Sequence, residues 1–184
     1  MAEKARASFA ERFFSPQYEW AADVVDRDAP GTADFTLRPN AAICFALRHN
    51  IIPPERRAAV LRATARHLLT PRGLRSLTPE DPRYKPTYRG NVLTRDRAYH
   101  QGTVWMWTLA PYVKGVLAER ERVPELAEKL PEIREAILQH FEKEGCLNQA
   151  SEIFDAEEPF TPRGCFAQAW SVAAIIEIVN AVGP

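Results

Sequence analysis

Glutamate 152 is the residue of this chain whose surroundings best suit acid–base chemistry. Ala150 lies two positions before it, and Ile153 and Phe154 follow it, so apolar residues occur on both sides of the carboxylate in a segment that leads into an apolar helix. A carboxylate held in such a place loses hydration, and it can then serve as a general base that deprotonates water. The alternative is that Glu152 is one solvated acid among the 24 Asp and Glu residues of the chain.

A second group of polar side chains comes from consecutive positions, Tyr99, His100 and Gln101, immediately before an apolar segment. Their directional donors and acceptors suit the hydroxyl groups of a polyol. Trp105 follows closely, and an indole ring can stack on the C–H face of a sugar. Two structural alternatives remain open: His100 can be a histidine that is hydrogen-bonded near a helix start, and Trp105 can belong to the core.

Arg38 and Asn40 place a guanidinium fork and an amide at the start of another apolar segment. They could contact a ligand. Equally, Asn40 could cap the helix while Arg38 pairs with a nearby carboxylate. Asp155, three residues after Glu152, is predicted to cap the turn or to orient Arg163.

Several classes of function are disfavoured by composition and motif. The formal net charge is zero, which argues against a nucleic-acid partner, and no apolar run approaches the roughly 20 residues of a membrane span. The sequence has no metal-ligand spacing, Gly-rich phosphate loop or GxSxG motif, so we expect no metal and no cofactor. The N-terminus lacks the features of a secretory signal, and Cys44, Cys146 and Cys165 form no CxxC pair, which together favour a cytoplasmic protein.

Helical periodicity runs along most of the chain and predicts an all-α fold with a single domain over residues 1–184. We expect six helices, at 3–14, 40–49, 55–69, 103–119, 124–144 and 166–179. Those at 40–49, 103–119 and 166–179 are apolar nearly all round, which predicts burial, while the other three carry one apolar stripe. The long segment 71–98 is expected to be an ordered loop.

Alternation of buried and amphipathic helices is typical of a double-ring helical barrel. Six helices make half of a twelve-helix ring, and half a ring would expose the flanks of its inner helices. An apolar surface of that size generally needs a partner.

Several motifs, taken together and in order, resemble the C-terminal part of glycogen debranching enzymes, the amylo-α-1,6-glucosidase domain. The motifs are Arg38-Pro39-Asn40, the segments 69–77 (LTPRGLRSL) and 81–84 (DPRY), the segment 99–105 (YHQGTVW), the segment 151–155 (SEIFD), and the segment 163–171 (RGCFAQAWS).

The resemblance implies an (α/α)6 toroid, of which this chain would be roughly the C-terminal half. It also implies inverting hydrolysis of the α-1,6-linked glucose stub of glycogen or limit dextrin, by two carboxyl groups about 6.5–9.5 Å apart. By this resemblance Glu152 matches the general base. The residues implied to line the terminal-glucose pocket are Tyr99, His100, Gln101 and Trp105, with Arg38 and Asn40 supporting its wall.

The sequence also departs from the family pattern. The general acid of the family is an aspartate in an earlier part of the barrel, and we find no counterpart for that part here. Met106, Ala41 and Ala156 replace the proline, glutamine and glycine that are usual at these places. Three interpretations stay open: the base-bearing half of an α-1,6-glucosidase that is completed by an N-terminal half, a non-catalytic half barrel that binds α-glucan, and a homodimer that closes the ring.

Overall fold

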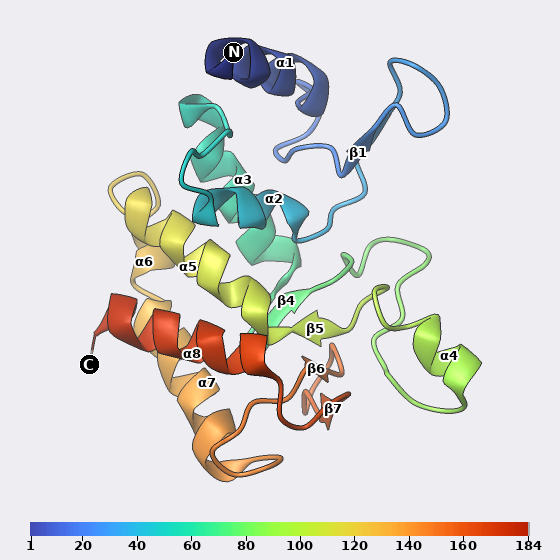
Figure 1. Ribbon diagram of the computed structural model, residues 1–184, viewed down its shortest axis with the longest axis vertical. Helices are drawn as coiled ribbons and strands as arrows, with labels where there is room; N and C mark the ends of the chain where they lie inside the picture. Colours follow the sequence, from blue (N-terminus) through green and yellow to red (C-terminus); the bar gives the residue numbers. More distant parts are fainter. Residues whose placement is uncertain (184) are drawn as a thin grey trace.

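The computed structural model describes residues 1–183 and is rich in helix (Figure 1). This confirms the helical character that the periodicity predicts. The α-helices are α1 (Ala2–Phe13), α2 (Asn40–Ile43), α3 (Pro54–His67), α4 (Val92–Asp96), α5 (Leu109–Ala118), α6 (Pro124–Ala127), α7 (Leu130–Lys143) and α8 (Ala169–Val182). Two 3₁₀ helices, η1 (Cys44–Ala46) and η2 (Met106–Thr108), adjoin α2 and α5.

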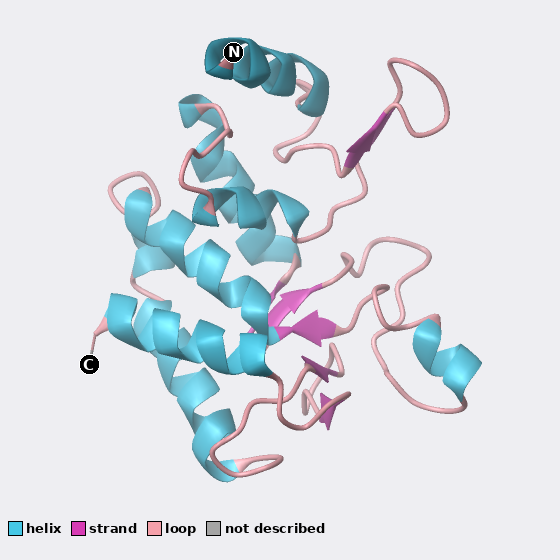
Figure 2. Ribbon diagram, in the orientation of Figure 1, coloured by secondary structure: helices cyan, strands magenta, loops and turns pink. Residues whose placement is uncertain are grey.

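The structure also contains two small sheets, which the all-α prediction does not include (Figure 2). One pairs β1 (Val24–Val25) with β2 (Ala33–Asp34). The other is antiparallel throughout, in the order β3 (Leu69–Thr70), β4 (Gly73–Arg75), β5 (Val104–Trp105), β6 (Ile153–Phe154) and β7 (Pro162–Arg163). Strands of two or three residues are too short to produce a period-two pattern, and segments far apart in sequence hold them together.

The helix predicted from Thr103 begins later, at Leu109, because the chain first runs as β5 and η2. Val104 pairs with Arg75 on one side and with Phe154 on the other. The Thr103 hydroxyl donates a hydrogen bond to the Tyr99 carbonyl (2.6 Å), which holds the preceding turn. These non-local contacts outweigh the local helical preference of the segment.

Two other predicted elements also differ in detail. The helix expected at 124–144 is divided into α6 and α7. The expected loop at 71–98 contains β4 and the short helix α4, whose first turn is capped by Asn91 through a 2.9 Å hydrogen bond from the Thr94 amide.

Helices α5 and α8 lie side by side, and both begin next to β4 and β5 (Figure 1). On its other side α5 packs against η1, and α8 packs against α7. The contact of α5 with η1 requires Gly115, since a Cβ at this position would lie 2.7 Å from Cγ of Phe45. Two helices that are far apart in sequence, α5 and α8, therefore begin close to the same sheet.

Helix α8 buries only one of its faces. Ser171, Ile175 and Ile178 are buried, whereas Trp170 is 46% exposed and Ile176 is 56% exposed. The prediction that this helix is enclosed on all sides therefore does not hold within the described chain. Across residues 1–183, none of the helices combines the length and the apolar character needed to cross a bilayer.

Candidate active site

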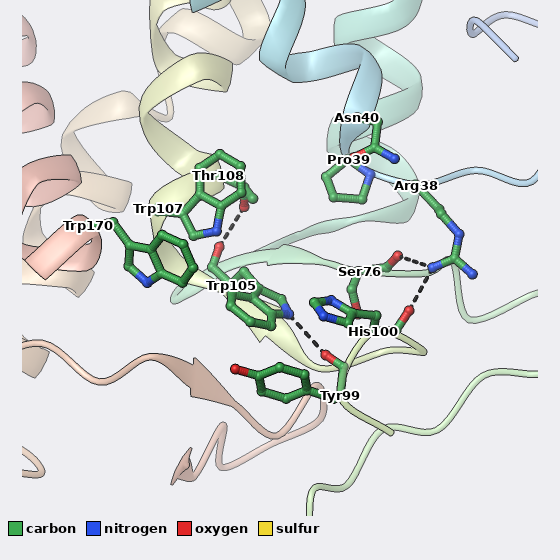
Figure 3. Close-up of a pocket in the computed structure, with 10 residues that line it drawn as sticks. All are labelled: Arg38, Pro39, Asn40, Ser76, Tyr99, His100, Trp105, Trp107, Thr108 and Trp170. Carbon is green, nitrogen blue, oxygen red and sulfur yellow. Dashed lines mark hydrogen bonds between the residues drawn. The ribbon is translucent and has the colours of Figure 1, made fainter. Parts of the chain in front are cut away.

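A pocket of about 420 Å³ lies where α2, α5 and α8 begin (Figure 3). Pro39 and Asn40 start α2, Thr108 precedes α5, and Trp170 is in the first turn of α8. The loop before β5 completes the wall. The lining residues are Arg38, Pro39, Asn40, Ser76, Tyr99, His100, Trp105, Trp107, Thr108 and Trp170.

Aromatic rings form most of this wall. The imidazole of His100 stacks on Trp105 with 5.0 Å between ring centroids and an angle of 7° between planes. Tyr99 and Trp170 meet Trp105 edge-on, at 4.9 Å and 5.8 Å. Trp105 is only 5% exposed and its indole N–H donates to the Tyr99 carbonyl (3.2 Å), so it supports the wall while Trp170 is far more open.

His100 is placed to act as a neutral ring. Burial lowers its pKa, and the positive charge of Arg38 lowers it further. A neutral imidazole presents one donor and one acceptor nitrogen, which suits the hydroxyl group of a sugar.

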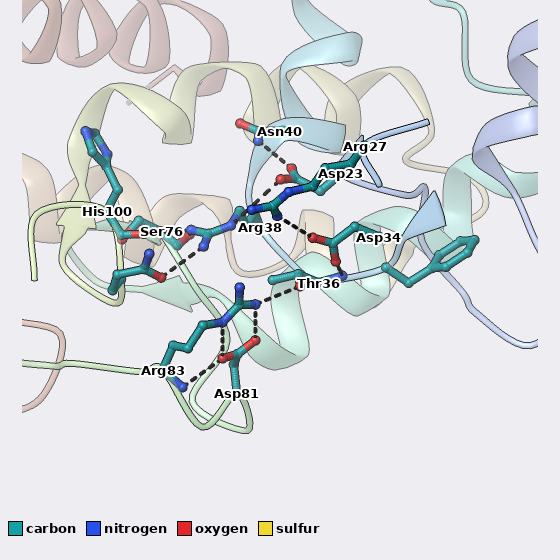
Figure 4. A network of polar contacts seen from close by, with 12 residues as sticks. Asp23, Arg27, Asp34, Thr36, Arg38, Asn40, Ser76, Asp81, Arg83 and His100 are labelled. Carbon is teal, nitrogen blue, oxygen red and sulfur yellow. Dashed lines mark hydrogen bonds and ion pairs between the residues drawn. The ribbon is translucent and has the colours of Figure 1, made fainter. Parts of the chain in front are cut away.

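Arg38 holds the loop that carries the aromatic wall (Figure 4). Its Nη1 donates to the carbonyls of Ser76 (2.9 Å) and His100 (2.6 Å), and its Nη2 donates to Oε1 of Gln101 (2.9 Å). Its Nε lies 3.8 Å from Asp23. Of the two roles that the sequence leaves open for Arg38, the structure favours pairing with protein groups.

Asn40 is the first residue of α2, and Pro39 occupies the capping position before it. The Asn40 amide donates to the Asp23 carboxylate (2.5 Å) (Figure 4). Asp23 thus ties the start of α2 to Arg38. Asn40 lines the pocket without capping the helix.

Glu152 stands immediately before β6, and its carboxylate accepts hydrogen bonds from three sides. The Tyr99 hydroxyl donates to Oε1 (2.5 Å), the Cys165 amide donates to Oε2 (3.0 Å), and the Gln168 side chain lies 3.5 Å from Oε1. Burial, followed by the adjacent Glu152 carboxylate, raises the pKa of Tyr99. The tyrosine therefore keeps its proton and remains a donor to Glu152.

The Glu152 carboxylate faces a second, more open hollow of about 580 Å³ next to the aromatic pocket. Tyr88, Arg95, Pro162, Arg163, Gly164 and Cys165 line this hollow with it. Tyr99 belongs to the wall of the aromatic pocket and also contacts Glu152, so it is the direct link between the two.

Gly164 makes the position of Glu152 possible. Its φ angle is 68°, in the left-handed region that favours glycine. A Cβ at this position would lie 2.4 Å from Oε2 of Glu152. The backbone at Gly164 therefore packs directly against the Glu152 carboxylate and leaves no room for a side chain.

Asp155 orients Arg163, one of the two roles predicted for it. Its Oδ2 accepts from Nε (3.0 Å) and Nη2 (2.8 Å) of Arg163, and its Oδ1 accepts from the Tyr88 amide (2.8 Å). This joins β7 to the segment that carries Tyr88.

The sequence-predicted residues thus fall into three places. Arg38, Asn40, Tyr99, His100 and Trp105 meet in the aromatic pocket. Glu152 lies beside this pocket. Gln101 is outside the pocket lining, and its side chain accepts a hydrogen bond from Arg38. Sequence reasoning missed the contributions of Ser76, Thr108, Tyr88 and Gly164, whereas the tryptophans at 107 and 170 were visible as aromatic residues next to apolar segments.

Within the described residues, no group of three or more His, Cys, Asp or Glu side chains is arranged to hold a metal ion. The available chemistry is that of a carboxylate, a protonated phenol and a neutral imidazole beside aromatic surfaces.

The sequence of this chain is similar to proteins that act in glycogen debranching. The family model described as amylo-alpha-1,6-glucosidase matches residues 1–177. A glycogen debranching enzyme of Saccharomyces cerevisiae is 30% identical over 87 residues. That match covers 44% of this chain and 6% of the yeast enzyme, so the similarity concerns a small part of the relative's length.

Proposed function

The chain belongs to the amylo-alpha-1,6-glucosidase family, and on that premise we propose that it supplies the general base and one wall of the glucose pocket in an inverting α-1,6-glucosidase. The proposed substrate is an α-glucan, glycogen or limit dextrin, that carries a single α-1,6-linked glucose as a branch stub. The proposed base is Glu152.

The observation that carries the proposal is the contact between Tyr99 and Glu152. Tyr99 lines the aromatic pocket, and its hydroxyl reaches the carboxylate at 2.5 Å. A glucose held in the pocket would therefore lie next to a carboxylate that is already oriented by donors. In an inverting mechanism such a carboxylate takes a proton from the water that attacks the anomeric carbon.

The chemistry of the pocket supports a neutral sugar ligand. His100 and Trp105 give a flat apolar surface, and Trp170 adds a second indole face that is partly exposed. Neutral His100 offers a donor and an acceptor to hydroxyl groups. The N-terminal ends of the longer helices α5 and α8 lie at the pocket, and their partial positive charge favours oxygen acceptors there.

We propose that the general acid comes from a polypeptide segment other than these residues. By resemblance it is an aspartate of an earlier part of an (α/α)6 toroid, in which α2 with η1, α5 and α8 would be inner helices. The exposed apolar face of α8, with Trp170 46% exposed and Ile176 56% exposed, supports such a neighbour, as does Phe166 in the loop before α8, which is 65% exposed.

The exposed apolar face of α8 is also consistent with the two alternative interpretations. A second copy of the chain could cover α8 and close a ring, or the half barrel could bind α-glucan without hydrolysing it. In neither case would the chain itself contribute the aspartate.

Hydrolysis of phosphorylase-limit dextrin tests the proposal. Purified chain is assayed alone and together with the acid-bearing segment of the barrel, and the released sugar is followed by proton NMR. The proposal predicts glucose that appears first as the β anomer, because inversion converts an α linkage. Glucose that appears first as the α anomer would contradict it, and sugar binding without any hydrolysis in the reconstituted system would favour the binding module.

A further inference from the structure

A polar network around the buried side chain of His140 lies outside the lining of both hollows. It joins the turn between β3 and β4, the last turn of α7 and the loop before β6. Arg72 donates to Oε1 of Glu144 (2.6 Å), and the other carboxylate oxygen of Glu144 lies 3.3 Å from Nδ1 of His140. Nε2 of His140 then accepts a hydrogen bond from the backbone amide of Ser151 (3.1 Å).

This arrangement determines where the ring proton of His140 must be. A backbone amide can only donate, so Nε2 must carry a lone pair and no proton. The single proton of the neutral ring therefore lies on Nδ1, where the Glu144 carboxylate accepts it. Orientation of an imidazole by a carboxylate in this way fixes its tautomer.

The surroundings of His140 keep the ring neutral. The side chain is fully buried, and Phe154 of β6 meets the ring edge-on at 4.7 Å. Burial lowers the pKa of His140 most, the positive charge of Arg72 lowers it too, and Glu144 opposes both. Glu144, which directly follows α7, and Arg72 of the facing turn are the charged groups that act on the ring.

The amide held by His140 is next to the proposed base. The backbone at residues 150–152 is tied at three successive points: the Ala150 carbonyl accepts from the Gln168 amide (2.8 Å), the Ser151 amide donates to His140, and the Glu152 amide donates to the Cys165 carbonyl (2.8 Å). Of these three contacts, the one to His140 is the only one that depends on a titratable group.

We propose that His140 is a positioning residue for Glu152, which it holds in place through the Ser151 amide only while its Nε2 is unprotonated. The inference rests on the proposed role of Glu152 as general base. It implies that protonation of His140 turns an acceptor into a donor opposite the Ser151 N–H, which breaks the contact and releases the segment that carries Glu152.

Two substitutions of His140 distinguish the effect of losing the hydrogen-bond acceptor Nε2 from the effect of losing the volume of the ring. In His140→Gln the side-chain oxygen can occupy the position of Nε2 and still accept from Ser151. In His140→Phe a ring of similar size remains without an acceptor. We expect His140→Phe to lower glucose release by the active assembly about tenfold, and His140→Gln to restore most of it.

NMR of the full chain provides readouts that do not depend on turnover. In the wild type, the ¹⁵N shifts of the His140 ring at neutral pH should show a protonated Nδ1 and an unprotonated Nε2. On acidification, the amide signals of Ser151 and Cys165 should move together with the titration of His140. In His140→Gln this pH-dependent movement should disappear.

A ring proton on Nε2 at neutral pH would overturn the inference, even if His140→Phe does not fold. So would equal glucose release by the Phe and Gln variants, or Ser151 and Cys165 signals that titrate unchanged in His140→Gln. If Glu152 proves not to be the base, glucose release will be insensitive to Glu152→Gln, whereas the tautomer and the titration are measured independently of that result.

Discussion

Replacement of Gly164 by alanine tests how the Glu152 carboxylate is held. A Cβ at Gly164 would lie 2.4 Å from Oε2 of Glu152 and 3.0 Å from Cγ1 of Ile153. The first distance is far inside van der Waals contact, so the carboxylate has to move. Movement would break its 3.0 Å hydrogen bond from the Cys165 amide.

The expected cost has two parts. A residue with a Cβ at the left-handed φ of 68° costs about 1–2 kcal/mol relative to glycine. A lost hydrogen bond to an ionised group costs about 1.5–3 kcal/mol when buried, which we reduce to about 1 kcal/mol because Glu152 is only half-buried and water can replace the donor. Gly164→Ala should therefore lower the free energy of unfolding by about 2–3 kcal/mol.

Gly31 provides the matched control. Its φ is 84°, and a Cβ there would meet nothing within 4 Å. Gly31→Ala should lower the free energy of unfolding by about 1–2 kcal/mol through the backbone alone. Urea denaturation of both variants measures the difference. Equal destabilisation by the two substitutions, or full glucose release by an assembly that contains Gly164→Ala, would refute the argument that Gly164 cradles the base.

Three further predictions concern the pocket and its pH dependence. Tyr99→Phe should lower glucose release about 10- to 100-fold with little change in sugar affinity, because it removes one donor from the Glu152 carboxylate; a steady-state assay that shows unchanged kcat would contradict this. Trp170→Ala should weaken maltooligosaccharide binding, measured by calorimetry, about tenfold. Ile176→Ala, on the same exposed face of α8 but outside the pocket, should leave binding unchanged. Equal effects of the two substitutions would show that the Trp170 indole does not contact the sugar. Burial lowers the pKa of His140 below its ordinary value of 6.5, so the unfolded chain takes up a proton there more readily than the folded chain. The free energy of unfolding should therefore fall as the pH drops below about 6.5. Denaturation midpoints that do not change between pH 7.5 and 5.5 would contradict this.

The sequence predicts the longer helices well because their apolar spacing is local information. The helix expected at 55–69 is found as α3, at Pro54–His67, and the amphipathic stripe of 124–144 is found mainly in α7. The gathering of residues 38–40 with 99–105 could also be anticipated, through the resemblance to a family whose motifs recur in the same order.

Other features depend on contacts that no local pattern reveals. Val104 and Trp105 form a strand because β4 and β6 flank them, although their own spacing favours helix. The hydrogen-bond partners of Arg38 lie 38 to 63 residues away in sequence, so its role in holding the aromatic loop is visible only in the folded chain. The half-ring interpretation anticipates an exposed apolar flank such as that of α8, but an apolar helix pattern does not say which residues of the helix form it or which neighbour covers it.

The most direct test of the account is glucose release from phosphorylase-limit dextrin by the reconstituted barrel, with Glu152→Gln compared with Glu158→Gln. Both substitutions neutralise a carboxylate in the same region of the chain, but Glu158 is exposed and lies outside both hollows. The account predicts that Glu152→Gln abolishes glucose release and retains maltooligosaccharide binding, while Glu158→Gln retains both. Glucose release by Glu152→Gln at the rate of the Glu158→Gln control would show that Glu152 is not the general base.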